Sequence, residues 1–107
     1  MTLECYGLVQ SLYKDAGYIF PETAEDKDWT PEAVEEELIN NYGAMRISTI
    51  DALDYDLLIL NIGGKAHLGV FWRDGLFFHY AKARSVASDF TGYWRRHLYS
   101  VLRLKKK

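Results

Sequence analysis

Residues 56–81 read DLLILNIGGKAHLGVFWRDGLFFHYA. Residues 56–62 are almost continuously apolar, which is typical of a strand with both faces buried. Residues 63–65 form a predicted turn, and residues 67–72 and 76–81 are predicted strands on either side of residues 73–75. This stretch therefore predicts three consecutive strands of an antiparallel sheet.

The chain before this stretch predicts two helices. Apolar side chains recur at steps of three and four over residues 3–16, with Thr2 as the expected N-cap. Thr30 as N-cap and Pro31 at the first helical position open a second helix, which Gly43 is expected to end.

The remaining segments complete an α+β pattern. Residues 18–29 are a predicted charged loop, residues 83–92 a polar connection, and residues 99–104 a last strand. Helices followed by an antiparallel sheet are typical of the α+β class. A chain of 107 residues is expected to form one domain, residues 1–107.

Two histidines on the second predicted hairpin can share one face only with one turn length. A two-residue turn at residues 74–75 would direct His67 and His79 to opposite faces of the sheet. A three-residue loop at residues 73–75 instead pairs His79 with Gly69 and makes the two imidazoles diagonal neighbours on one face. Such loops typically end with a residue in the left-handed region, which suits the glycine at position 75, and Gly69 leaves room beside the rings.

Cys5, the only cysteine, lies in the first turn of the first predicted helix. A thiol at a helix start with two hairpin imidazoles is the minimum set for a papain-like nucleophile. The helix dipole would favour the thiolate, neighbouring Glu4 would oppose it, His67 would accept the thiol proton, and His79 would orient His67. Two alternatives remain open: a small apolar core cysteine beside structural histidines, and a Cys/His/His zinc site, which has fewer ligands than structural zinc usually takes.

Composition argues against several other classes. A single cysteine excludes an internal disulfide framework, and no signal peptide or membrane-spanning apolar run is present in the sequence. The net charge of −2 argues against a nucleic-acid partner. Residues 22–37 are acidic and residues 95–107 are basic. This uneven charge predicts a solvated surface or, as the alternative, a surface that docks a partner or an anionic polymer.

The order of these motifs resembles the NlpC family of papain-fold cysteine peptidases. The motifs that carry the likeness are ECYGLV at 4–9, DLLI at 56–59, HLGVF at 67–71, DG at 74–75 and FFHY at 77–80. YWRR at 93–96 and VLR at 101–103 are similar to the short forms that tailed phages and prophages encode as tail-assembly proteins. The likeness spans nearly the whole chain and implies a papain-like NlpC fold, with N-terminal helices packed on an antiparallel sheet.

The resemblance also implies an activity and a setting. Cys5 matches the nucleophile, His67 the general base and His79 the residue that orients the base, and no metal or organic cofactor is implied. The implied substrate is the peptidoglycan stem peptide. The implied setting is a phage or prophage tail, with tail proteins as possible partners. We expect the protein in the host cytoplasm during assembly, and in the virion tail or the periplasm and cell wall when it acts. A catalytically inactive tail-assembly or docking module, and a thiol acyltransferase or amidase on the same fold, remain alternatives.

Two departures from the family pattern bear on the site. The family usually has Asp before the cysteine and often Ser after it, where this chain has Glu4 and Tyr6. We expect the bulkier Tyr6 to narrow the groove, and Tyr6, Glu4 and Gly69 to contact the substrate. Many members carry a tyrosine-containing segment before the cysteine, whereas four residues precede Cys5 here. We expect backbone N–H groups around Cys5, or another chain, to complete the oxyanion site.

Overall fold

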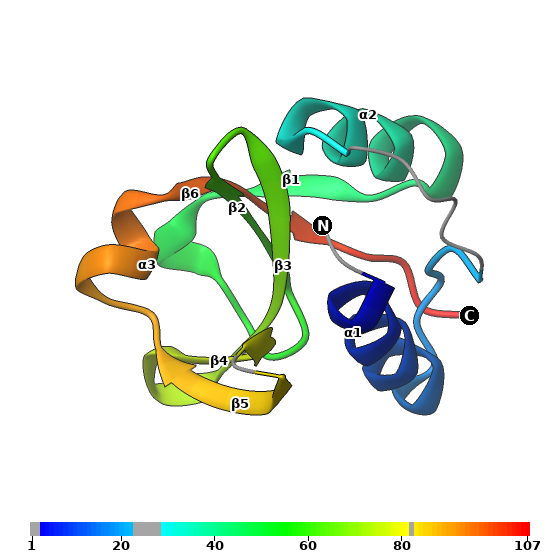
Figure 1. Cartoon of the computed structure of the whole chain (residues 1–107). Coiled ribbons are helices and arrows are strands. Elements are labelled where there is room, and N and C mark those ends of the chain that lie inside the picture. Colours follow the sequence, from blue (N-terminus) through cyan, green and yellow to red (C-terminus); the bar gives the residue numbers. More distant parts are fainter. Residues whose placement is uncertain (1–2, 23–28, 82) are drawn as a thin grey trace.

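Two helices pack against one face of a six-stranded antiparallel sheet (Figure 1). The computed structural model describes residues 3–22, 29–81 and 83–107. The sheet order is β1-β6-β2-β3-β4-β5. The elements are, in chain order, α1 (Leu3–Ala16), α2 (Pro31–Tyr42), β1 (Met45–Ile47), η1 (Thr49–Asp51), β2 (Leu57–Ile62), β3 (Lys65–Trp72), η2 (Arg73–Gly75), β4 (Leu76–Ala81), β5 (Arg84–Asp89), α3 (Gly92–Arg96) and β6 (Leu98–Arg103). The predicted α+β architecture is confirmed.

The two long helices form where the sequence predicts them. The Thr30 side chain accepts a hydrogen bond of 3.2 Å from the N–H of Ala33, and Pro31 occupies the first position of α2. Gly43 ends α2 with φ of 71°, a left-handed conformation that favours glycine. The predicted cap of α1, Thr2, and part of the predicted loop, residues 23–28, lie outside the described residues.

The turns set the register of the three central strands. Gly63 and Gly64 both have positive φ, as a two-residue hairpin turn requires, and they join β2 to β3. Trp72 pairs with Leu76, so a three-residue loop joins β3 to β4. This confirms the loop that a shared histidine site requires, and its last residue, Gly75, has φ of 72°.

Side chains bury both faces of the sheet. Leu57 and Ile59 of β2 lie in a cluster that includes residues of α1 and α2, whereas Leu58 and Leu60 lie in a second cluster on the opposite face. The second cluster contains Phe77 and Phe90, with Trp94 packed against it. Because β2 is covered on both sides, its sequence is continuously apolar instead of alternating.

Three short elements depart from the prediction. Residues 84–89, predicted as part of a polar connection, form the edge strand β5, because pairing with β4 requires a hydrogen-bonding partner and not an apolar sequence. The short strand β1 and the one-turn helix α3 carry too few residues for a periodic pattern, and neither was predicted. The last strand begins at Leu98, one residue earlier than predicted.

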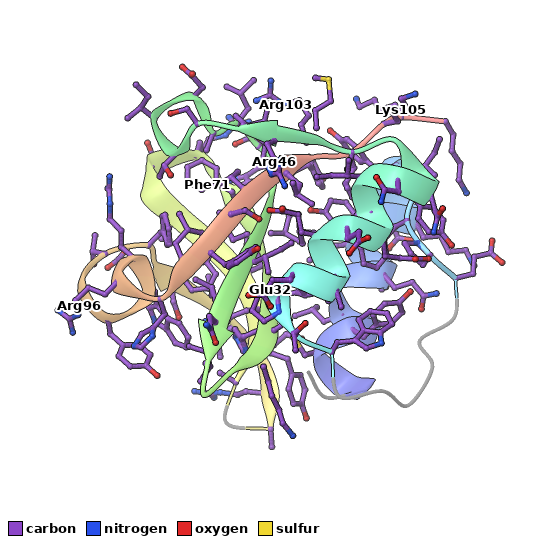
Figure 2. The ribbon with its side chains drawn as sticks, turned by 90° about the horizontal axis from the view of Figure 1, so that it is seen from above. Glu32, Arg46, Phe71, Arg96, Arg103 and Lys105 are labelled. Carbon is purple, nitrogen blue, oxygen red and sulfur yellow. The ribbon has the colours of Figure 1, made fainter. Side chains whose placement is uncertain are left out.

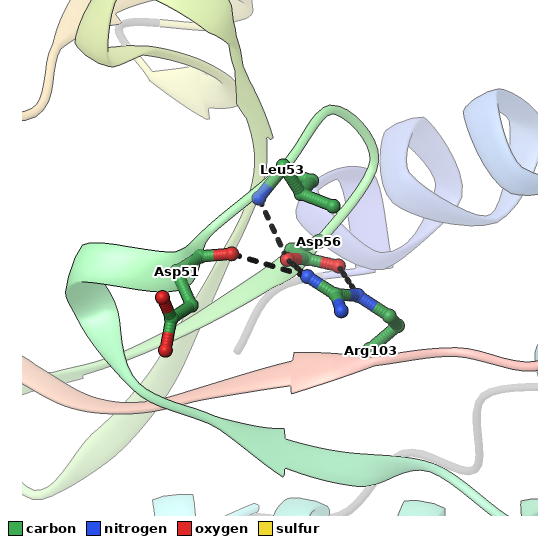
Figure 3. A network of polar contacts seen from close by, with 4 residues as sticks. All are labelled: Asp51, Leu53, Asp56 and Arg103. Atoms are coloured by element: carbon green, nitrogen blue, oxygen red, sulfur yellow. Dashed lines mark hydrogen bonds and ion pairs between the residues drawn. The ribbon is translucent and has the colours of Figure 1, made fainter.

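A buried carboxylate ties the loop before β2 to the last strand (Figure 3). Asp56 accepts hydrogen bonds from Arg103 Nε at 3.0 Å, from an Arg103 terminal nitrogen at 2.9 Å and from the Leu53 N–H at 2.8 Å. The same guanidinium donates to the Asp51 carbonyl at 3.2 Å. The charge is thus paired and hydrogen-bonded, which offsets the cost of burying it.

The basic residues near the C-terminus do not gather into one surface. Figure 2 shows Arg96, in α3, and Lys105 at opposite ends of the molecule. Arg103, between them in sequence, is engaged with Asp56. Lys105 is fastened near the end of α1, because its carbonyl accepts a hydrogen bond of 2.7 Å from the N–H of Ile19. Over the described ranges, no helix is both long and apolar enough to span a membrane.

Candidate active site

The two predicted histidines are in direct contact across the β3–β4 hairpin. His67 Nε2 lies 2.9 Å from His79 Nδ1, a hydrogen-bond distance. The contact follows from the three-residue loop, since that register brings positions 67 and 79 to the same face. The other nitrogen of His67, Nδ1, is therefore left to face another group.

Aromatic side chains enclose the histidine pair. Phe77 stacks on His79 with ring centroids 4.3 Å apart. Trp94 stacks on His67 with centroids 5.5 Å apart, and it makes an edge-to-face contact with His79 at a centroid distance of 4.7 Å. His79 has no exposed surface. Burial, followed by the charge of His67, lowers the pKa of His79 to about 4, and burial also lowers the pKa of His67 below its usual 6.5. Both rings are therefore neutral near pH 7.

Cys5 lies beside the peptide groups that follow both histidines. It is the third residue of α1, only 2% exposed, and its thiol donates to the carbonyl of Leu68 at 3.6 Å. The thiol also lies within hydrogen-bonding range of the Tyr80 backbone. Leu68 follows His67 and Tyr80 follows His79 in the chain, so the first turn of α1 packs at the level of the histidine pair.

The thiol and the rings belong to different sides of the hairpin. The Cys5 side chain packs in the helix-facing cluster, whereas the two rings contact Phe77 and Trp94 of the second cluster. Burial raises the pKa of the Cys5 thiol above its usual value, and backbone groups of Leu68 and Tyr80 only partly oppose this. The helix dipole therefore does not produce the thiolate that the sequence predicts, and the resting thiol is neutral.

The predicted substrate contacts have other roles in this conformation. Tyr6 is buried, its hydroxyl donates to the carbonyl of Pro21, and its ring packs against Phe20 and Trp29, so it fastens the chain on both sides of residues 23–28 to α1. Contact of Tyr6 with a substrate stays a prediction. The Glu4 side chain lies outside the described part of the structure.

Gly69 is required by its neighbours. A Cβ atom at this position would lie 2.6 Å from Phe77 Cδ2, which is closer than carbon atoms pack in proteins. The glycine thus admits the ring that stacks on His79. A substrate contact by Gly69 stays a prediction, and its structural role is to shape the wall of the histidine site.

Two residues in contact with the histidine pair were not assigned to the catalytic site from the sequence. Ser88 Oγ lies 2.8 Å from His79 Nε2, and Trp94 covers the histidine pair from α3. Residues 84–89 show no alternation of apolar and polar side chains, so the sequence carried no signal for Ser88. The signal for Trp94 was its place in a strongly polar segment, where an aromatic residue needs an apolar contact.

The described residues include no group of three or more His, Cys, Asp or Glu side chains that could hold a metal ion. The zinc alternative thus has no ligand set within these ranges. A hollow of about 400 Å³ is lined by residues further along α1, including Gln10 and Lys14, with Tyr18 and Lys107. This hollow does not include Cys5 or either histidine of the pair.

These features define an α+β fold with a cysteine at a helix start and a histidine pair on an adjacent hairpin, which is the papain-like class. The NlpC/P60 family profile matches residues 1–103, and the chain belongs to this family. Members of this family are generally cysteine peptidases or hydrolases.

A solved structure agrees with this fold. A crystal structure from Staphylococcus aureus, of a protein described as similar to a lipoprotein of the NLP/P60 family, matches 97% of this chain with a TM-score of 0.69 and 20% sequence identity. This chain spans 32% of that protein, and at this identity the likeness shows the fold alone. No curated protein sequence matches the chain.

Proposed function

We propose that this domain is a cysteine endopeptidase that cleaves the stem peptide of bacterial peptidoglycan. Cys5 is the nucleophile, His67 the general base and His79 the residue that holds the base. The observation that carries the proposal is the 2.9 Å contact between His67 Nε2 and His79 Nδ1, because it fixes the ring of His67 and leaves Nδ1 for a thiol. The position of Cys5 against the peptide group after His67 supports the same assignment.

The reaction proceeds through a thioester. In the reaction, the Cys5 thiol leaves the Leu68 carbonyl and approaches His67 Nδ1, which takes the thiol proton while Sγ attacks the carbonyl carbon of the scissile bond, and the carbonyl oxygen becomes an oxyanion. Backbone N–H groups at the start of α1 are the proposed donors to it. Collapse of the intermediate breaks the C–N bond, and His67 returns its proton to the departing amine. His67 then activates a water molecule that hydrolyses the thioester to a carboxylic acid and the free thiol.

The charge state of the site favours proton transfer during attack. Burial raises the pKa of Cys5 and lowers the pKa of His67, so both the thiol and the base are neutral near pH 7. Activity should therefore increase as His67 loses its proton, with an acid limb below pH 6.5.

The proposed biological setting is the tail of a phage or prophage. It rests on the resemblance of the segments at 93–96 and 101–103 to those of short tail-assembly proteins. In this setting the protein passes from the host cytoplasm to the virion tail, and acts at the periplasm or cell wall. Detection of the chain in purified tails from the strain that encodes it tests this proposal.

One observation favours a second candidate, a non-catalytic assembly module. Cys5 is only 2% exposed, and its pKa is raised, whereas reactive cysteines are usually accessible and have a low pKa. A module of this kind would bind tail proteins equally well with or without the thiol. An amidase or acyltransferase on the same fold is distinguished by its product, since it would transfer the acyl group to an added amine.

The test is digestion of purified peptidoglycan, with soluble products separated by chromatography and identified by mass. The wild-type protein is expected to release peptides with one new amino group and one new carboxyl group for each bond cleaved. Cys5→Ala and His67→Gln should release none, while their thermal unfolding shows that the domain is still folded. Turnover by Cys5→Ala would exclude Cys5 as the nucleophile, and acyl transfer to the added amine would move the assignment to an acyltransferase.

A further inference from the structure

Both ring nitrogens of His79 are engaged by side chains of neighbouring strands. Nδ1 lies 2.9 Å from His67 Nε2 on β3, and Nε2 lies 2.8 Å from Ser88 Oγ on β5. Three consecutive strands thus contribute a continuous chain of polar contacts, from His67 through His79 to Ser88. Apolar rings surround this chain, because Phe77 and Trp94 pack on His79.

The sheet register places Ser88 at this position. Phe77 pairs with Ser88 and His79 pairs with Val86. Side chains at positions 86 and 88 therefore share the face of Phe77 and His79, and Ser88 is the diagonal neighbour of His79. The exposed Ser85 lies on the same strand but faces the other way.

The protons on His67, His79 and Ser88 can be arranged in two ways. The neutral ring of His79 carries one N–H group. In the first arrangement, His79 Nε2–H donates to Ser88 and Nδ1 accepts from His67 Nε2–H, which leaves a lone pair on His67 Nδ1. In the second arrangement, Ser88 donates to His79 Nε2 and His79 Nδ1–H donates to His67 Nε2, which puts the proton of His67 on Nδ1.

Only the first arrangement lets His67 act as a base toward a thiol. The second puts an N–H donor at His67 Nδ1, where the reaction needs a lone pair. It also cannot stabilise an imidazolium at His67, because His79 Nδ1–H would point at the protonated Nε2 of His67. The first arrangement depends on an acceptor for His79 Nε2–H, since a buried N–H group without an acceptor costs about 1–3 kcal/mol. When the Ser88 hydroxyl is removed, the second arrangement leaves only the lone pair of His79 Nε2 without a partner.

We propose that Ser88 is a positioning residue that accepts the Nε2–H of His79 and thereby holds His67 in the tautomer that can deprotonate Cys5. Its role in turnover rests on the proposed function, whereas its effect on the tautomer does not. In this role Ser88 acts through His79 and not on the substrate. In serine proteases, where an aspartate holds the base in the same way, the wrong tautomer lowers kcat by about 10⁴.

The test compares Ser88→Thr with Ser88→Val, since these two side chains have nearly the same shape and differ by one hydroxyl. Nitrogen-15 NMR of the histidine rings at pH 7 reports which nitrogen carries the proton. The wild type and Ser88→Thr should show His79 protonated at Nε2 and His67 at Nε2. Ser88→Val should move both protons to Nδ1 and lower kcat by about 10²- to 10⁴-fold with little change in KM. Ser85→Ala, the control on the same strand, should match the wild type in both measurements.

The outcomes separate this inference from the proposed function. Protonation of His79 at Nδ1 in the wild type, or an unchanged tautomer and kcat in Ser88→Val, would overturn the role of Ser88. A change of tautomer in Ser88→Val, in a protein that cleaves no peptidoglycan, would support Ser88 and refute the proposed function. Near-ultraviolet circular dichroism verifies that both variants remain packed.

Discussion

Replacement of Gly69 by alanine should destabilise the domain through a single ring. The new Cβ would lie 2.6 Å from Phe77 Cδ2, and ordinary van der Waals contact begins at 3.4 Å, so the ring would have to withdraw by about 0.8 Å. Phe77 is fully buried and stacks on His79 at 4.3 Å, so it has no free space on its other side. Overpacking of this kind typically costs about 1–3 kcal/mol, and we expect about 2 kcal/mol here.

Urea unfolding followed by tryptophan fluorescence measures this cost. With a slope of about 1.5 kcal/mol per molar urea, a loss of 2 kcal/mol lowers the midpoint by roughly 1.3 M. Gly7→Ala is the matched control, because Gly7 lies inside α1, is exposed, and has no atom within 4 Å of its added Cβ. Alanine is favoured over glycine in a helix by about 0.8–1 kcal/mol, so this variant should unfold at higher urea.

The two glycine variants therefore have opposite predicted signs for the same chemical change. Gly69→Ala should also shift the NMR signals of the His79 ring, since Phe77 cannot move without changing its contact with His79. An unchanged midpoint for Gly69→Ala, together with a raised midpoint for Gly7→Ala, would refute the packing of Phe77 against Gly69.

Three further predictions concern pH, the aromatic cover and the buried ion pair. In the folded protein the pKa of His79 is about 4, against about 6.5 when unfolded, so the unfolded state binds the proton first as pH falls. The contribution of neutral His79 to the free energy of unfolding is thus complete above pH 6.5, and the free energy of unfolding is about 3 kcal/mol lower at pH 4. Urea titrations at several pH values should show that His79→Gln loses most of this pH dependence. Trp94→Leu removes the ring that covers His67, so the NMR titration midpoint of His67 should move upward toward 6.5. Arg103→Met leaves the Asp56 carboxylate buried without its counter-ion, and thermal or urea unfolding should show a loss of about 2 kcal/mol, less than for a fully buried pair because Arg103 is 35% exposed.

Matched variants provide the controls. His97→Gln, in which a histidine outside the pair is replaced, is measured alongside His79→Gln. A loss of pH dependence as large in His97→Gln as in His79→Gln would remove the assignment from His79. Arg73→Met breaks the exposed pair with Asp54 and should cause little change in stability, so an equal loss in both arginine variants would contradict the special role of the buried carboxylate.

The sequence was sufficient to predict features that depend on local chemistry. Thr30, Pro31 and Gly43 determine the ends of α2 through capping, a fixed φ and a left-handed φ. The three-residue loop after β3 followed from the hypothesis of a shared histidine site, because only that register puts the two histidines on one face. For α2, a few neighbouring residues contain the whole physical reason.

Features that depend on distant contacts could not be predicted. β5 is a strand because β4 offers it hydrogen-bonding partners, although its own residues are mostly polar. Trp94 reaches the histidines only because α3 turns back over the sheet, and Ser88 reaches His79 only through the β4–β5 register. The burial of Cys5 has the same origin, and it reverses the pKa direction that the helix dipole alone predicts.

The pH dependence of Cys5 alkylation tests most directly whether His67 activates this thiol. The rate is measured in the wild type, His67→Gln and His79→Gln, and it requires no knowledge of the substrate. The wild type should react near pH 7 with a rate that rises as His67 loses its proton, below pH 6.5, followed by a second rise as the thiol ionises above its usual range. His67→Gln should lose the first rise and keep the second, and His79→Gln should weaken the first. Identical profiles in all three proteins, or a wild-type thiol that reacts only after unfolding, would contradict a catalytic Cys5.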